Sequence, residues 1–122
     1  MAPLGLVEWV DAACFTVVTA LAGSGPGFLY RFIDALAGAG AALGLPADQA
    51  ARLALATVEG SALLAAAADV GPDVLADRVA SPGGSTRAGL NVLDRETGLA
   101  ALLRETLAAS ERRNAEMAAA AR

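Results

Sequence analysis

The chain has 122 residues, enough for one domain with a modest core, and its composition is 56% hydrophobic but only 4% aromatic. Its net charge is −4, it contains neither His nor Lys, and Cys14 is its single cysteine. This inventory excludes a Ser-His relay, a histidine metal site, a Schiff-base lysine and a Walker-type phosphate loop. The scattered arginines predict no nucleic-acid partner, and a lone cysteine, which we expect to be a small core residue, favours a reduced cytoplasmic setting.

Alanine is the commonest residue, and this points to the fold class. Alanine has the highest intrinsic helix propensity, so the composition predicts an all-α domain. A helix covered with alanine buries little area unless another backbone approaches it closely. We therefore expect tightly packed helices whose missing contacts come from a partner subunit.

The first ten residues differ from the rest. Residues 4–10 alternate apolar and mixed side chains and include β-branched and aromatic residues, which favours a strand. A lone strand has nothing to pair with in this sequence. It either pairs across a dimer or is a remnant of a sheet in a domain that the sequence does not contain. Asp11 can then cap a short helix over residues 12–21, which the following glycines end.

Helical periodicity predicts five further helices. Pro26, Pro46 and Pro72 lie at helix starts, where proline costs least, and Gly44 lies where the second helix stops. These helices span residues 26–43, 46–68, 71–79, 87–95 and 99–120. The last one carries a near-heptad stripe, typical of ordinary core or a dimer seam, formed by Leu99, Leu103, Leu107, Ser110, Asn114 and Met117.

A membrane hairpin is one alternative for the N-terminal part. Residues 12–30 contain no charged side chain, which is nearly the length of a bilayer span. However, residues 23–27 read Gly-Ser-Gly-Pro-Gly and should break the helix into two short pieces. We therefore expect no membrane-spanning segment.

Residues 81–86, Ser-Pro-Gly-Gly-Ser-Thr, form the most informative motif. Pro82 biases Ser81 toward an extended backbone, the two glycines allow unusual backbone angles, and Ser85 or Thr86 is a favoured N-cap for the next helix. Such a helix start carries unpaired N–H groups and a partial positive charge, so it can bind a carboxylate or phosphate without lysine or histidine. The alternative is a turn and helix cap only.

A second glycine-rich segment, residues 38–44, superficially resembles a nucleotide-binding fingerprint. That fingerprint works only after a strand and at the opening of a helix. Here the glycines lie inside and at the end of a predicted apolar helix. We interpret them as close-packing positions and not as a cofactor loop.

Two separated groups of motifs resemble one enzyme family. Residues 18–28, with residues 33–37 and 44–46, are similar to the start of the C-terminal domain of pyrroline-5-carboxylate reductases. Residues 79–86 and 108–112 resemble the same family at matching separations. The resemblance covers nearly the whole chain. Two departures are Gly-Ser-Ala-Leu from residue 60, where the family often has Gly-Ala-Ala-Lys, and Ser85, where others have Thr or Ala.

The resemblance implies a specific site. Such enzymes reduce 1-pyrroline-5-carboxylate to L-proline with NAD(P)H, and hydride transfer to a C=N bond is catalysed mainly by positioning. By resemblance, Gly83, Gly84, Ser85 and Thr86 offer backbone N–H groups to the substrate carboxylate, and Ser81 shapes or joins the site. The Thr86 hydroxyl is the candidate catalytic contact to the ring nitrogen.

The resemblance also implies an architecture. The chain is then a six-helix, all-α domain that forms an interlocked homodimer bundle, with higher oligomers left open. Residues 1–10 are a strand or linker from an absent N-terminal Rossmann domain, and residues 11–122 are the dimerisation and substrate-binding domain. NADPH or NADH serves the full-length enzyme, whereas this chain alone binds no cofactor or metal and is expected to be inactive. The alternative is a stand-alone helical oligomerisation or interaction module.

Overall fold

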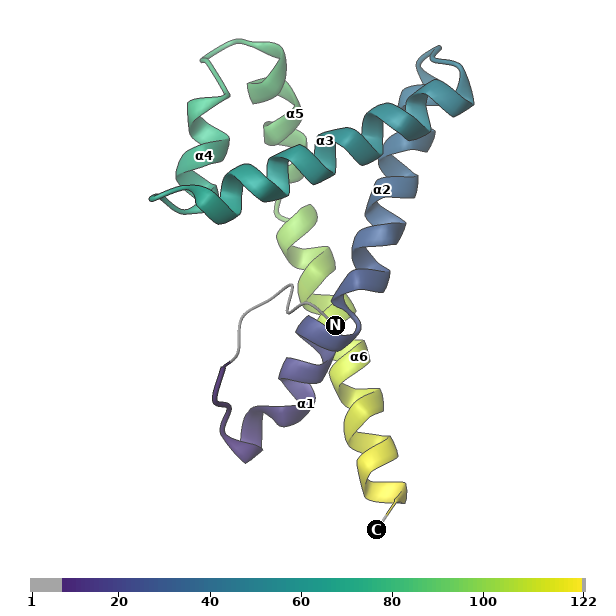
Figure 1. The fold of residues 1–122 in the computed structure, drawn as a ribbon, viewed down its shortest axis with the longest axis vertical. Coiled ribbons are helices and arrows are strands. Elements are labelled where there is room, and N and C mark those ends of the chain that lie inside the picture. Colours follow the sequence, from purple (N-terminus) through teal and green to yellow (C-terminus); the bar gives the residue numbers. More distant parts are fainter. Residues whose placement is uncertain (1–7, 122) are drawn as a thin grey trace. The chain divides into compact units, whose positions relative to one another are not determined.

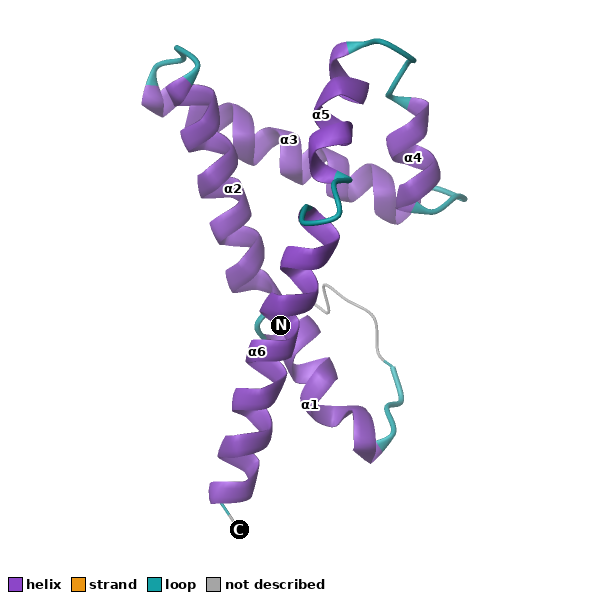
Figure 2. Ribbon diagram, turned by 180° about the vertical axis from the view of Figure 1, so that it is seen from behind, coloured by secondary structure: helices purple, strands orange, loops and turns teal. Residues whose placement is uncertain are grey.

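The computed structural model describes residues 8–121, and all regular structure in this range is helical (Figures 1 and 2). The predicted all-α class is confirmed. The elements are a 3₁₀ turn η1, a π-helical turn η2 and helices α1 to α6. Their bounds are η1 Ala12–Cys14, α1 Phe15–Val18, η2 Thr19–Gly23, α2 Gly25–Ala42, α3 Ala47–Ala67, α4 Pro72–Arg78, α5 Ser85–Leu93 and α6 Leu99–Ala120.

The predicted N-terminal strand lies mostly outside the described residues. Its described part, residues 8–10, has no regular structure. The boundary proposed between residues 1–10 and 11–122 stays a prediction. Asp11 takes the N-cap position of η1 with extended backbone angles, but its side chain makes no capping hydrogen bond.

The glycine-rich segment after η2 interrupts the helix less than its sequence predicts. Only Ser24 separates η2 from α2, and its backbone is itself right-handed helical, with φ −88° and ψ −17°. The π-helical turn makes the short break possible, because the Ser24 N–H reaches the Thr19 carbonyl at 3.0 Å, five residues back. Pro26 then falls in the first turn of α2, where its missing N–H costs little.

The chain divides into two compact units, and the first contains residues 1–26 and 102–122. In this unit polar side chains join the N-terminal helical turns to α6. The Thr16 hydroxyl donates to Glu111 Oε1 at 2.8 Å, and Asn114 Nδ2 donates to the Thr16 carbonyl at 3.3 Å. Ser110 Oγ lies 3.4 Å from Ser24 Oγ. The polar members of the predicted α6 stripe therefore bind the N-terminal segment.

The second unit contains residues 27–101, and a short turn in this unit joins α2 to α3. The turn between them is a Schellman motif. The Gly44 N–H bonds to the Ala41 carbonyl at 3.0 Å, and the Leu45 N–H bonds to the Gly40 carbonyl at 3.2 Å. Gly44 has φ +119°, which side-chain-bearing residues rarely adopt, so glycine is required there.

Close approach of small residues is seen next to this turn. A Cβ atom placed on Gly40 would lie 3.6 Å from the Ala50 Cβ and 3.4 Å from a Leu45 methyl group. Ala50 and Ala54 are only 2% and 5% exposed. These are ordinary van der Waals distances, so Gly40 lies against α3 but the contact does not require glycine. A Cβ atom placed on Gly38 would meet nothing within 4 Å among the described residues, so the close-packing role predicted for the α2 glycines stays a prediction.

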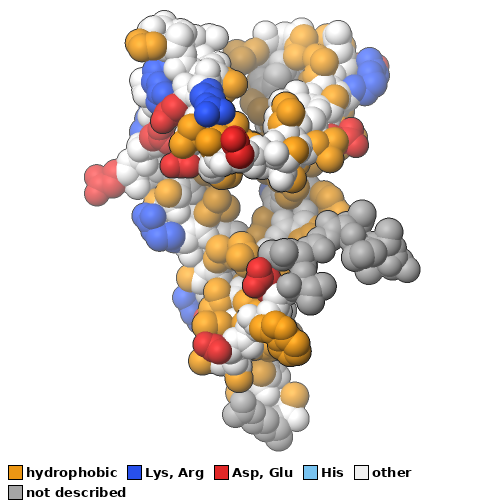
Figure 3. Space-filling model, turned by 60° about the vertical axis from the view of Figure 1, so that its left-hand side comes forward, with side chains coloured by type: hydrophobic (Ala, Val, Ile, Leu, Met, Phe, Trp, Pro, Cys, Tyr) orange, Lys and Arg blue, Asp and Glu red, His pale blue; other side chains and the backbone are white. Residues whose placement is uncertain are grey.

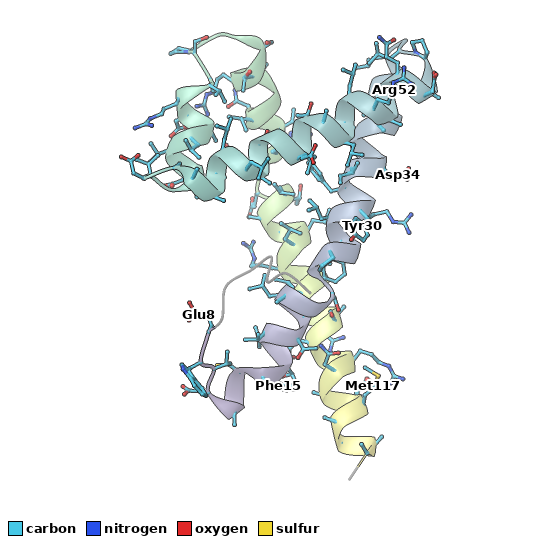
Figure 4. The ribbon with its side chains drawn as sticks, in the orientation of Figure 1. Glu8, Phe15, Tyr30, Asp34, Arg52 and Met117 are labelled. Atoms are coloured by element: carbon cyan, nitrogen blue, oxygen red, sulfur yellow. The ribbon has the colours of Figure 1, made fainter. Side chains whose placement is uncertain are left out.

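Burial within the chain is slight. The buried hydrophobic residues of the described part are four alanines, Ala20, Ala50, Ala54 and Ala80. Large apolar side chains stay on the surface, as Figure 3 shows for one face. Phe15 on α1 and Tyr30 on α2, both labelled in Figure 4, are each 67% exposed. Cys14 is also exposed, so its predicted core position is wrong for the chain by itself, which lacks the neighbours to cover it.

Two helical segments, Ala12–Ala42 and Ala47–Ala67, are long and apolar enough to cross a membrane by length and composition. Core helices of soluble proteins meet the same two criteria. Only 6% and 11% of their most apolar windows are buried in this chain. Both segments therefore need a further surface to cover them.

We predict that Gly44→Ala lowers the free energy of unfolding by about 1–2 kcal/mol, because alanine resists positive φ. Urea denaturation followed by circular dichroism measures the change. Gly44→Asn is the matched variant and should lower the free energy of unfolding by less, since asparagine enters the positive-φ region more readily than alanine does. Equal stability of Gly44→Ala and the parent chain would show that the turn does not need its left-handed residue.

Candidate anion-binding site

The predicted site residues lie in the loop between α4 and α5 and in the first turn of α5. Within it, the Gly84 N–H donates to the Ser81 carbonyl at 3.0 Å, which closes a turn with Pro82 and Gly83 at its centre. Gly83 has φ +75°. Proline followed by a residue with positive φ is the pattern of a type II turn. The sequence Ser-Pro-Gly-Gly therefore reverses the chain just before α5.

The residue that precedes α5 corrects one expectation. Gly84 is the N-cap, with extended angles of φ −83° and ψ 172°, and no side chain caps the helix. Neither Ser85 nor Thr86 is the cap, because both already lie in the first turn. The tight turn closed at Gly84 brings the chain into the helix two residues earlier than the predicted start at residue 87. Both hydroxyl groups are therefore free for other partners.

Three backbone donors point out of the start of α5. The first helical hydrogen bond runs from the Ala88 N–H to the Gly84 carbonyl at 3.0 Å. The N–H groups of Ser85, Thr86 and Arg87 precede this bond, and within residues 8–121 they have no backbone acceptor. Donors of this kind, at the positive end of a helix dipole, favour an anion. Of the donors predicted from the sequence, Ser85 and Thr86 keep free N–H groups, whereas the Gly84 N–H is used by the Ser81 carbonyl, and the Arg87 N–H joins the set without having been predicted.

The hydroxyl groups of the loop are accessible. The Ser81, Ser85 and Thr86 side chains are exposed, and none of them makes a hydrogen bond to another described residue. The Ser81 hydroxyl lies close to the loop backbone: a Cβ atom placed on Gly84 would come within 2.6 Å of it. Glycine at position 84 therefore lets the Ser81 hydroxyl lie beside the helix start.

One contact of the loop was not predicted from the sequence. Arg87 Nη2 on α5 donates to Asp77 Oδ1 on α4 at 2.9 Å, and the two side chains are 29% and 73% exposed. The two residues flank the loop at a separation of ten positions. Opposite charges on either side of a tight glycine loop were the available signal.

A second candidate surface lies between α2 and α3. We call it the α2–α3 groove, an open apolar depression of about 430 Å³. A smaller depression of about 210 Å³ continues it toward the Gly44 turn. The groove is lined by Leu29, Phe32, Leu36, Thr57, Val58, Ser61 and Ala62. Its walls are exposed leucine and phenylalanine side chains, so it fits an apolar partner.

The apparent nucleotide-binding fingerprint does not fit a dinucleotide. The glycine-rich segment 38–44 lies inside α2 and at its end, as predicted, where its N–H groups belong to the helix and its Schellman turn. A dinucleotide fingerprint requires a strand followed by the start of a helix. Residues 8–121 also contain no group of three or more Cys, Asp or Glu placed to hold a metal ion.

Comparison with known proteins identifies relatives. The sequence profile of the family described as "Pyrroline-5-carboxylate reductase dimerisation" matches residues 12–117. The pyrroline-5-carboxylate reductase of Arabidopsis thaliana is 40% identical over 109 residues, which are 89% of this chain and 40% of that protein. The reductase of Treponema pallidum is 47% identical over 90 residues, 74% of this chain and 34% of that protein.

Solved structures share the fold. The pyrroline carboxylate reductase of Plasmodium falciparum, solved with NADP bound, aligns with a TM-score of 0.83 and 28% identity over 93% of this chain and 43% of that chain. The 1-pyrroline-5-carboxylate reductase of Streptococcus pyogenes aligns with a TM-score of 0.83 and 35% identity, over 90% and 42% of the two chains. This chain therefore spans less than half the length of these relatives.

We predict that Ser81→Ala and Gly84→Ala are coupled. Alone, Gly84→Ala forces the Ser81 hydroxyl away from the helix start. In the double variant that hydroxyl is absent. Gly84→Ala should therefore lower the free energy of unfolding by about 0.5–1 kcal/mol less in the Ser81→Ala background than in the parent chain. Urea denaturation of the four proteins measures the coupling. Strictly additive losses would contradict the close approach of residues 81 and 84.

Proposed function

Because the chain belongs to the pyrroline-5-carboxylate reductase dimerisation family, we propose that it is the helical half of an enzyme that reduces 1-pyrroline-5-carboxylate to L-proline. The observation that carries the proposal is the set of free N–H groups at Ser85, Thr86 and Arg87, which lies within the matched region. The substrate has one carboxylate on a five-membered imine ring. We place that carboxylate at the start of α5, with Ser81, Gly83 and Gly84 shaping the loop around it.

Thr86 is the proposed catalytic residue. Its hydroxyl is on the first turn of α5, next to the N–H groups that hold the carboxylate. The ring nitrogen is two bonds from the carboxyl carbon, so the hydroxyl can contact it. Reduction adds a hydride to the ring carbon of the C=N bond and a proton to the nitrogen. A hydroxyl that bonds to this nitrogen orients the ring, and positioning of this kind contributes most of the catalysis. The chain needs no histidine or lysine for it.

The hydride donor belongs to the full-length enzyme. We propose that a nicotinamide cofactor, NADPH or NADH, is bound by a Rossmann domain that is not part of this chain. The Plasmodium falciparum relative, solved with NADP bound, supports a cofactor of this class. The glycine-rich segment 38–44 does not fit a dinucleotide, so we expect this chain alone to have no reductase activity.

The partner proposed for the apolar surface is a second copy of the chain. The α2–α3 groove leaves Leu29 45% and Phe32 43% exposed, and contiguous apolar surface of this kind marks an interaction site. Two copies that interlock through α2 and α3 would cover these residues. We propose a soluble, cytoplasmic homodimer, which can assemble further, and this assembly accounts for the family description as a dimerisation domain.

We predict that the chain is a dimer in solution and that Phe32→Glu disrupts it. A carboxylate in the groove is costly to bury unpaired, so the variant should be monomeric or largely unfolded at micromolar concentration. Light scattering after gel filtration and circular dichroism measure mass and helicity. Arg31→Glu, the adjacent position on a charged part of α2, is the control and should remain dimeric. A parent chain that is a stable helical monomer would contradict the proposal.

We predict that Thr86→Ala in the full-length protein reduces kcat/KM for 1-pyrroline-5-carboxylate by roughly tenfold to a hundredfold, the loss of one buried hydrogen bond to a reacting group. The Kd for NADPH should stay unchanged. Steady-state kinetics and fluorescence titration measure the two quantities. Thr106→Ala is the control, because the Thr106 hydroxyl bonds only to the Leu102 carbonyl of its own helix. Unchanged kinetics in Thr86→Ala, or robust turnover by the isolated chain, would contradict these assignments.

A further inference from the structure

Two charged side chains on either side of the candidate site stand at helix ends that disfavour them. Asp77 is the second-last residue of α4, where the helix dipole is negative, and Arg87 is the third residue of α5, where the dipole is positive. Each charge is therefore unfavourable on its own helix. Their 2.9 Å contact supplies the compensating interaction, since each places its charge beside the other.

The Asp77–Arg87 pair also closes the loop that carries the site. Asp77 accepts two hydrogen bonds from residues of the loop and of α5. Its carbonyl accepts from the Ala80 N–H at 3.2 Å, and its carboxylate accepts from Arg87 Nη2 at 2.9 Å. Between the two residues lies Gly83, which adopts a positive φ and, because it has no Cβ atom, can take many alternative backbone conformations. Ala80, at 8% exposure, is the one buried side chain in this loop. Few other contacts restrict the loop.

We propose that Arg87 and Asp77 are positioning residues, which hold the loop of residues 79–84 in the conformation that presents the N–H groups of Ser85 and Thr86 to the substrate carboxylate. This inference rests on the proposed function. The pair acts through the loop and touches no reacting atom. Because the carboxylate does not change during the reduction, loss of the pair should weaken substrate binding equally in the ground and transition states.

The test uses the full-length protein and two single variants. Arg87→Gln and Asp77→Asn each remove the ion pair and keep a similar side-chain shape. We expect both to raise KM for 1-pyrroline-5-carboxylate roughly two- to fivefold, the size expected for a partly exposed pair, with kcat unchanged. The reversed pair, Asp77→Arg with Arg87→Asp, should return KM toward the parent value.

Asp77→Asn separates positioning from simple attraction of the anion by the Arg87 charge. If attraction were the role, removing the Asp77 carboxylate would free the guanidinium and lower KM, and a lower KM would overturn the proposal. A fall in kcat at constant KM would indicate partial unfolding and would also overturn it. The matched control is Arg52→Gln, which removes the exposed 3.3 Å pair with Asp48 on α3 and should leave KM unchanged.

The same experiment distinguishes this inference from the function on which it rests. If the unsubstituted full-length protein, given NADPH, does not reduce 1-pyrroline-5-carboxylate, the proposed function fails. If that protein turns over and KM is the same in Arg87→Gln as in the parent, only the positioning role fails.

Discussion

Burial of the apolar faces of α2 and α3 is the interaction on which the folded state of this chain depends. Full burial of one leucine or phenylalanine side chain contributes roughly 1.5–3 kcal/mol, and ordering the backbone costs roughly 1–2 kcal/mol per residue. Among the described residues only four alanines are buried, and the burial of an alanine side chain offsets little of this entropy cost. The groove side chains can offset it only when another apolar surface covers them. Folding and association are therefore expected to be one process, as in obligate dimers.

The candidate site depends on different forces. Its anion receptor is made of backbone N–H groups, and the loop before it is shaped by a four-residue turn, a glycine with positive φ and one ion pair. All of these contacts lie within residues 77–88. The local shape of the site is thus encoded in a short segment. The proposed carboxylate site needs no histidine or lysine, because its electrostatic recognition would come from peptide dipoles.

The sequence predicts the helices well because their ends are marked by special residues. Pro26, Gly44 and Pro72 lie at or next to the observed helix ends, and the predicted span of residues 99–120 matches α6. The glycine turn before α5 was predictable for the same reason, and its role as an anion receptor stays a prediction. The N-cap was not, because serine and threonine outrank glycine on local preference, and the turn closed at Gly84 overrides it.

Contacts between distant residues were the part that the sequence could not supply. The Thr16–Glu111 hydrogen bond joins residues 95 positions apart, and no local pattern specifies such a pairing. The exposure of Cys14 was missed for a related reason: apolar neighbours in sequence predict a core position only when the fold brings a second layer over them. In this chain by itself no such layer covers Cys14.

A second copy covers the apolar helices at lower cost than a lipid bilayer would. Arg31 and Asp34 lie in the middle of α2, and Glu59 lies within α3. Each charge at the centre of a bilayer costs about 2.5–3.5 kcal/mol on insertion scales. In an aqueous dimer the same side chains can stay in water while the groove closes, because α2 has both a charged part and an apolar face. The hydropathy that makes α2 and α3 resemble membrane spans is therefore better explained as a protein interface.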